Sequence, residues 1–195
     1  DGDAFVAALV AALRSAPTHA MLTPQMRGGV EAGRAAWAAH PALQALLAEP
    51  AAEGASPQPF LAQVEVATFI ADAHLHEEVF GPAALVVRVA DTAQAIDVLR
   101  AVGGTLTVTI WGADEASEAN TALVRAATQV AGRVLFAGFP TGVAVTAGQQ
   151  HGGPFPSSTQ PATTSVGWAA MDRFLRPVAL QDAPAWLAAR QGRPC

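Results

Sequence analysis

The chain has 195 residues and a mass of 19.9 kDa, which is the size of one domain. Hydrophobic residues make up 51% of it and charged residues 14%, with a formal net charge of −5, so the composition of a disordered chain is excluded. The 11 basic residues are all arginines and they are scattered along the chain, which argues against a nucleic-acid partner.

Membrane association and disulfide bonding find no support in the sequence. The longest apolar stretches, such as Ala83–Val87, fall far short of the ~20 residues that a membrane-spanning helix needs, so we expect no membrane partner. The first residues lack the basic and apolar regions of a signal peptide. The single cysteine, Cys195, excludes an internal disulfide framework and a cysteine metal cluster. These features fit a reducing compartment, and we expect a cytoplasmic protein.

The N-terminal part is predicted to be helical. Ala4–Leu13 places apolar side chains four residues apart, which indicates a one-sided helix. Thr23 and Pro24 are typical of the N-cap and first position of a second helix, which should run to about Ala39. The glycines of this second helix predict close packing against a neighbour. They are Gly28, Gly29 and Gly33.

The middle of the chain alternates between strand and helix patterns. Strands are predicted at Phe60–Val66, Ala83–Val89, Leu106–Trp111 and Val134–Phe136, and helices at Thr92–Val102 and Glu115–Ala131, with Gly132 as the residue that ends the last helix. This alternation predicts an α/β fold with a mostly parallel open sheet and helical crossovers.

The pattern dissolves between Ala137 and Gly167, where six glycines and several prolines are interspersed with polar residues. An irregular segment of this length inside a compact domain is more often functional than idle. A final strand is predicted at Arg173–Leu180 and a short helix at Pro184–Ala189.

Several common catalytic motifs are absent. No G-x-G-x-x-G turn is present for a dinucleotide and no G-x-S-x-G elbow for a serine hydrolase, and without lysine there is no Walker A loop or Schiff base. His74 and His76 beside Glu77 and Glu78 could be metal ligands, but no third cluster completes them. We therefore expect a polar loop there and no metal.

The most informative segment is Glu77-Glu78-Val79-Phe80-Gly81-Pro82, at the entry to a predicted buried strand. By itself this segment is typical of a Gly-Pro boundary before a strand, with Phe80 as an ordinary core residue. Followed by a buried strand, however, it resembles the aldehyde dehydrogenase superfamily. Six further segments, in the same order along the chain, resemble the branch that oxidises 2-oxoglutarate semialdehyde and related aldehydes. They are Met21–Pro24 with Glu31–Gly33, Gly132–Phe136, Gly138–Val143, His151–Pro156, Thr164–Gly167 and Arg173–Val178.

This resemblance implies a reaction and shows which of its parts lie elsewhere. In the superfamily a cysteine thiolate attacks the aldehyde, and the thiohemiacetal passes a hydride to NAD or NADP to give a thioester that is hydrolysed. The nucleophile and the nucleotide-binding domain precede the region that is matched here, and Cys195 lies beyond it. Residues 1–195 thus resemble the C-terminal part of a catalytic domain, which should be inactive alone.

The resemblance also implies residue roles. Glu78 should accept hydrogen bonds from the nicotinamide-ribose hydroxyls, and Phe80 should pack near the nicotinamide. Phe139, His151 and Phe155 should line the pocket for a small-molecule aldehyde, although the two phenylalanines could instead fill the core beneath the loop. No residue of this chain is expected to carry out the covalent chemistry.

Two further expectations concern assembly and an alternative function. Residues 171–182 should form a C-terminal strand that takes part in subunit contacts, and the full-length protein should be a homo-oligomer. The alternative is a non-catalytic module that binds a small molecule or a partner through residues 138–167.

Overall fold

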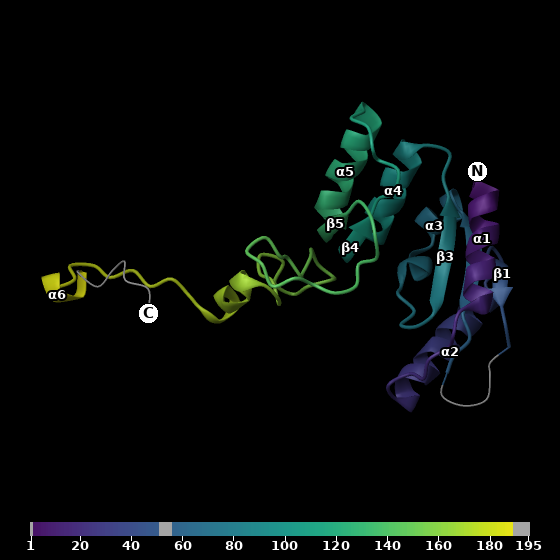
Figure 1. Ribbon diagram of the computed structural model, residues 1–195, viewed down its shortest axis with the longest axis horizontal. Helices are drawn as coiled ribbons and strands as arrows, with labels where there is room; N and C mark the ends of the chain where they lie inside the picture. Colours follow the sequence, from purple (N-terminus) through teal and green to yellow (C-terminus); the bar gives the residue numbers. More distant parts are fainter. Residues whose placement is uncertain (1, 51–55, 189–195) are drawn as a thin grey trace.

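The computed structural model describes residues 2–50 and 56–188. Two helices, α1 (Gly2–Ser15) and α2 (Pro24–Ala39), precede a three-stranded sheet, and a second unit of helices and strands follows it (Figure 1). Thr23 caps α2 as expected, because its side chain accepts a hydrogen bond from the Met26 amide at 3.2 Å. Among the described residues, no helix is both long and apolar enough to cross a membrane.

The first sheet has the order β1-β2-β3. The strand β1 (Gln44–Ala48) pairs antiparallel with β2 (Phe60–Glu65), which pairs parallel with β3 (Ala83–Arg88). A short helix α3 (Val66–Ala71) and a 3₁₀ helix η1 (Ala73–His76) form the crossover between the two parallel strands. The sequence analysis missed β1, because its five residues carry no β-branched side chain and the edge of β2 decides their conformation.

The second sheet consists of β4 (Thr105–Thr109) and β5 (Ala131–Leu135), which pair in parallel across the helix α5 (Glu118–Val130). The helix α4 (Thr92–Val102) joins the two sheets in sequence and packs on α5. The predicted α/β fold with mostly parallel pairing and helical crossovers is therefore confirmed, although the strands divide between two sheets. Gly132 follows the C-cap residue Ala131 of α5, as expected, but it already lies inside β5 and is not in the left-handed conformation typical of a glycine at a helix end.

The core lies between the first sheet and its crossover. Val64, Phe69 and Leu75 form a buried cluster against which Trp37 and Leu85 pack. Burying side chains of this size contributes roughly 1.5–3 kcal/mol each. The cluster fixes α3 and η1 against the sheet and so sets where the segment after η1 begins.

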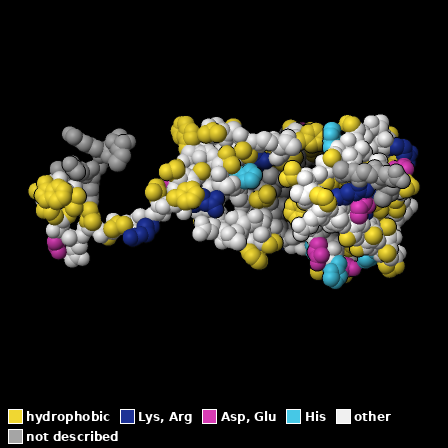
Figure 2. All heavy atoms as spheres, turned by 90° about the horizontal axis from the view of Figure 1, so that it is seen from below, with side chains coloured by type: hydrophobic (Ala, Val, Ile, Leu, Met, Phe, Trp, Pro, Cys, Tyr) yellow, Lys and Arg dark blue, Asp and Glu magenta, His cyan; other side chains and the backbone are white. Residues whose placement is uncertain are grey.

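The predicted C-terminal strand is wrong in this structure. Residues Trp168–Phe174 form a 3₁₀ helix, η2, and the following residues up to α6 (Ala185–Ala188) pair with no strand of the described chain. This part leads away from the rest of the molecule and carries apolar side chains on its surface (Figures 1 and 2). An extended segment becomes a strand only where another strand offers its backbone groups, and the described chain offers none here.

Candidate functional site

The segment that follows η1 alternates its side chains between two sides. Val79 packs onto α2 at Gly33, where an added Cβ would lie 2.8 Å from the Val79 methyl groups. Gly81 meets Val30 of the same helix, where an added Cβ would lie 2.5 Å from a methyl carbon. The expected close packing on α2 is thus confirmed at Gly33, whereas Gly28 has nothing within 4 Å. Only glycine allows the two backbones to approach this closely.

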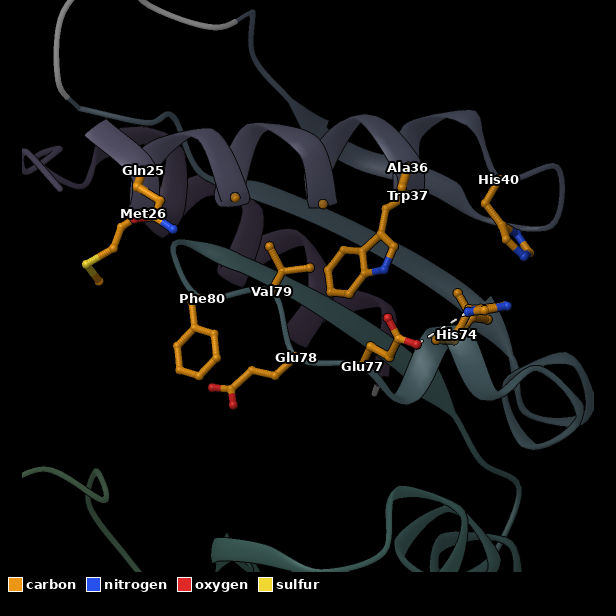
Figure 3. A pocket seen from close by; sticks show the side chains of 13 residues that line it. Gln25, Met26, Ala36, Trp37, His40, His74, Glu77, Glu78, Val79 and Phe80 are labelled. Atoms are coloured by element: carbon orange, nitrogen blue, oxygen red, sulfur yellow. Dashed lines mark hydrogen bonds and ion pairs between the residues drawn. The ribbon is translucent and has the colours of Figure 1, made fainter. Parts of the chain in front are cut away.

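Glu78 and Phe80 point away from α2, side by side, on the opposite side of the segment from Val79 (Figure 3). Both are exposed, Phe80 to 69%. They border a pocket of about 580 Å³ between α2 and the segment. The helix contributes residues that the sequence analysis did not assign to a site, because nothing in the pattern of α2 marks which face would be covered. They include Gln25, Met26, Gly29 and Trp37.

The far end of this pocket is fixed by a hydrogen-bonded link between α2 and η1. His40, which follows α2, accepts the Ala42 amide at Nδ1 (3.2 Å), so its Nε2 carries the proton and donates to Asp72 Oδ2 at 3.0 Å. The other Asp72 oxygen accepts the His74 amide at 3.0 Å. The hydrogen bond from His40, and next the one from the His74 amide, lower the pKa of Asp72 below its usual value of 3.8.

The two histidines considered as metal ligands have other partners. His74 pairs with Glu77 at 3.4 Å, as the dashed line in Figure 3 marks. His76 Nε2 hydrogen-bonds the Phe69 carbonyl at 2.6 Å, and its ring lies 4.8 Å from the Phe69 ring. Within the described ranges 2–50 and 56–188, no three histidine, cysteine, aspartate or glutamate side chains are grouped as a metal site.

The irregular segment that follows β5 packs closely on the second sheet at two glycines. A Cβ added at Gly132 would collide with the Gly152 carbonyl, and one at Gly104 would collide with the Phe155 carbonyl. Arg133 of β5 holds the beginning of the segment, because its guanidinium donates to the carbonyls of Pro140 at 2.8 Å and Gly142 at 3.1 Å. The sequence analysis missed Arg133 as an anchoring residue, since a strand arginine gives no local signal of its partners.

The three residues expected in the aldehyde pocket are not all brought together. His151 lines a second pocket of about 430 Å³, whereas Phe139 and Phe155 do not line it. Phe139 is 82% exposed and Phe155 is 77% exposed, so the two phenylalanines do not fill the core of the described chain. His151 itself is held by its amide, which donates to Thr164 Oγ1 at 2.8 Å, and by the contact of Nδ1 with Ser165 Oγ at 2.9 Å.

The chain resembles two curated proteins over most of its length. It is 39% identical to alpha-ketoglutaric semialdehyde dehydrogenase 2 of Azospirillum brasilense over 186 residues, which cover 94% of this chain and 35% of that protein. It is 37% identical to alpha-ketoglutaric semialdehyde dehydrogenase of Acinetobacter baylyi, over 92% of this chain and 35% of that protein. The chain therefore spans about a third of the length of the curated relatives that it matches. No protein-family model matches it.

The fold is similar to that of a betaine aldehyde dehydrogenase from Staphylococcus aureus. The TM-score is 0.69 at 15% identity, and the match covers 90% of this chain and 35% of that one. A second structure of the same enzyme, a complex with NAD⁺, has a TM-score of 0.68 and matches 89% of this chain and 36% of its own. At such identity the likeness concerns the fold.

Proposed function

The chain belongs to the aldehyde dehydrogenase family, and from this premise we propose that it is part of an NAD- or NADP-dependent enzyme that oxidises an aldehyde to the carboxylic acid. We infer that residues 1–195 are the C-terminal part of the catalytic domain, and that the nucleophilic cysteine and the nucleotide-binding domain precede them. The names of the two curated relatives make 2-oxoglutarate semialdehyde the first substrate to test.

The observation that carries this proposal is the arrangement of Glu78, Val79 and Phe80. Val79 packs against Gly33 of α2, so its neighbours Glu78 and Phe80 point away from α2. Their side chains lie next to each other and are exposed (Figure 3). Glu78 forms no ion pair or hydrogen bond within the described chain, so its two oxygens are free to accept from the vicinal hydroxyls of a ribose. Phe80 offers an uncovered apolar ring beside it, against which a nicotinamide could pack.

These residues fit a nicotinamide nucleotide, which when bound accepts the hydride. The role of this part of the chain would be to position the nucleotide. Glu78 would fix the ribose, Phe80 would limit the tilt of the attached ring and exclude water, and α2 would support both through Val79. The link from His40 to Asp72 keeps α2 and η1 at a fixed separation, so the segment between η1 and β3 has a defined start.

For the aldehyde, we propose the segment that begins after β5. Phe139 and Phe155 expose apolar rings, and His151 supplies a polar group held in one orientation. Glycines and prolines allow this segment to lie close to a ligand without ordering on binding. The carbonyls that Arg133 holds fix its first turn.

We further propose that the full-length protein is a cytoplasmic homo-oligomer in which residues 171–182 contact a partner subunit. Support comes from the exposed apolar side chains Leu175, Val178 and Leu180 on a segment that leads away from the rest of the described chain (Figure 1). Apolar surface of this kind typically marks an interaction site.

The test uses the full-length protein that contains this sequence, with 2-oxoglutarate semialdehyde and either NAD or NADP. Glu78→Gln should slow hydride transfer about tenfold or more in single-turnover measurements, because a hydrogen bond to a charged group contributes roughly 1.5–3 kcal/mol. Glu77→Gln is the matched control, since this neighbouring carboxylate pairs with His74 and should leave the rate almost unchanged.

Two results would contradict the proposal. One is a Glu78→Gln protein with unchanged single-turnover rate and unchanged cofactor affinity. The other is turnover by the rigorously purified 195-residue chain, which should be inactive because the thiolate that begins the reaction is expected to lie outside it. Full-length protein that binds ligands through residues 138–167 but oxidises no aldehyde would favour the alternative of a binding module.

A further inference from the structure

Thr164 is buried in a segment where most residues are exposed or half-buried. Its side chain is 2% exposed, and within the described part of the chain Arg34 of α2 is the only other buried polar residue. Burying a hydroxyl costs free energy unless the hydroxyl is hydrogen-bonded. The partners of Thr164 therefore indicate what this side chain does.

The Thr164 hydroxyl is bound only by backbone groups. Its Oγ1 accepts from the His151 amide at 2.8 Å and from the Val166 amide at 3.3 Å, and it donates to the Val166 carbonyl at 2.8 Å. A hydroxyl has one hydrogen and two acceptor positions, so all three are used. The contacts with Val166 are local, whereas His151 lies 13 residues earlier in the chain. The hydroxyl thus links two separate parts of the segment.

Ser165 holds the same histidine at two further points. Its amide donates to the His151 carbonyl at 3.0 Å. Its Oγ lies 3.0 Å from the same carbonyl oxygen and 2.9 Å from Nδ1 of the imidazole. His151 is therefore held at its amide, its carbonyl and its ring by two consecutive residues. Nε2 of the ring has no hydrogen-bond partner within residues 2–50 and 56–188, so it is the ring nitrogen left for a ligand.

The residues next to His151 continue this pairing. Gln150 Nε2 donates to the Thr163 carbonyl at 3.1 Å, and a Cβ added at Gly152 would lie 2.8 Å from the same oxygen. Residues 150–152 therefore run beside residues 163–165, although neither stretch forms a strand. Without a regular ladder of backbone hydrogen bonds, side-chain hydroxyls have to fix the separation of the two stretches.

We propose that Thr164 and Ser165 are positioning residues, which hold His151 so that its Nε2 meets a polar group of the aldehyde substrate in a fixed place. The inference rests on the proposed function and deepens it, because it names the residues through which the segment after β5 would act on the substrate. A side chain on an irregular segment loses conformational freedom when it binds a ligand. That loss is smaller where the folded protein has already fixed the side chain.

The first test measures steady-state kinetics of the full-length protein with 2-oxoglutarate semialdehyde. Thr164→Val removes the hydroxyl and should lower kcat/KM for the aldehyde about tenfold, with KM for the cofactor unchanged, because the His151 amide loses its acceptor. Thr164→Ser keeps a hydroxyl and should restore most of the activity. Thr128→Val is the control, since it removes an exposed hydroxyl that donates to the Arg125 carbonyl of α5, away from the site.

A double-mutant cycle with His151→Ala separates positioning from a general loss of stability. If Thr164 acts through His151, adding Thr164→Val to His151→Ala should change kcat/KM for the aldehyde less than twofold. Ser165→Ala should give a smaller loss than Thr164→Val and should also have no further effect on the His151→Ala protein. Because Ser165 is exposed, this second cycle remains measurable even if the Thr164→Val protein does not fold.

Amide hydrogen exchange, followed by mass spectrometry, tests the contact without any turnover. Exchange at the His151 amide should be at least tenfold faster in Thr164→Val and unchanged in Thr164→Ser. If the aldehyde is oxidised but losses multiply in both cycles, or exchange at His151 does not respond to Thr164→Val, the positioning inference fails and the enzyme remains. If exchange depends on Thr164 but no aldehyde is oxidised, the proposed function fails while the hold of Thr164 on His151 stands.

Discussion

Individual side chains at the proposed site are oriented by contacts with one or two neighbouring residues and not by deep burial. The packing of Val79 on Gly33 sets the direction of Glu78 and Phe80, and Ser165 Oγ contacts Nδ1 of His151 at 2.9 Å. Phe139 and Phe155 have no comparable support in the described chain, where both rings are largely exposed. Their proposed role is therefore best examined by removing a ring.

Phe155→Ala in the full-length protein should raise KM for the aldehyde roughly tenfold and leave KM for the cofactor unchanged. The ring is 77% exposed in this chain, so its loss removes ligand contact and little core packing, worth about 1.5 kcal/mol. Steady-state kinetics with both substrates measure this, and Phe5→Ala, which removes a ring 65% exposed on α1, is the control. A lower melting temperature with unaltered aldehyde KM would assign Phe155 to the core.

Helices and strands meet at a small number of polar links and glycine contacts. His40 and Asp72 join the end of α2 to the start of η1, and Gly104 and Gly132 let residues 152–155 lie on the second sheet. The first kind of link depends on charge and the second on the absence of a side chain. They should therefore respond differently to pH.

The link from His40 to Asp72 should make stability depend on pH at the acid end. Its hydrogen bonds lower the pKa of Asp72 in the folded state below 3.8, so its contribution is complete above pH 3.8 and is lost as the pH falls through the lowered value. The groups that face the carboxylate are His40 and the His74 amide.

Asp72→Asn should thus lower the melting temperature at pH 7 by a few degrees at most, and the difference should shrink steadily as the pH falls below 3.8. Thermal melts at pH 7 and at a series of pH values below 3.8 provide the measurement. Asp97→Asn, which removes an exposed partner of Arg100, serves for comparison. A deficit that stays constant from pH 7 down through the acid series would mean that Asp72 acts through packing.

On the scale of the whole molecule, the described chain leaves surfaces that suit further polypeptide. The segment after η2 leads away from the body and carries apolar side chains on its surface (Figure 2). Leu175, Val178 and Trp186 are each more than half exposed. Folded domains rarely keep such a segment uncovered. The proposed occupant is a second copy of the full-length protein.

Leu175→Asp combined with Val178→Asp should therefore shift the full-length protein toward smaller species in sedimentation velocity. Each carboxylate would be costly to bury in an apolar contact. Gln129→Glu adds a charge at an exposed polar position of α5, outside residues 171–182, and should leave the assembly intact. A double variant that sediments as the unaltered protein does would exclude this segment from the interface.

The sequence by itself determined the order and type of most helices and strands, because the apolar period and the cap at Thr23 are local properties. It also determined the family resemblance, which rests on short segments in a fixed order. Only the tertiary structure decided that Gln44–Ala48 forms a strand and Arg173–Leu180 does not, since pairing depends on a distant neighbour. The partners of Arg133 and Ser165 were likewise decided by how the segment after β5 folds, because Arg133 donates to the carbonyls of Pro140 and Gly142 and Ser165 contacts His151.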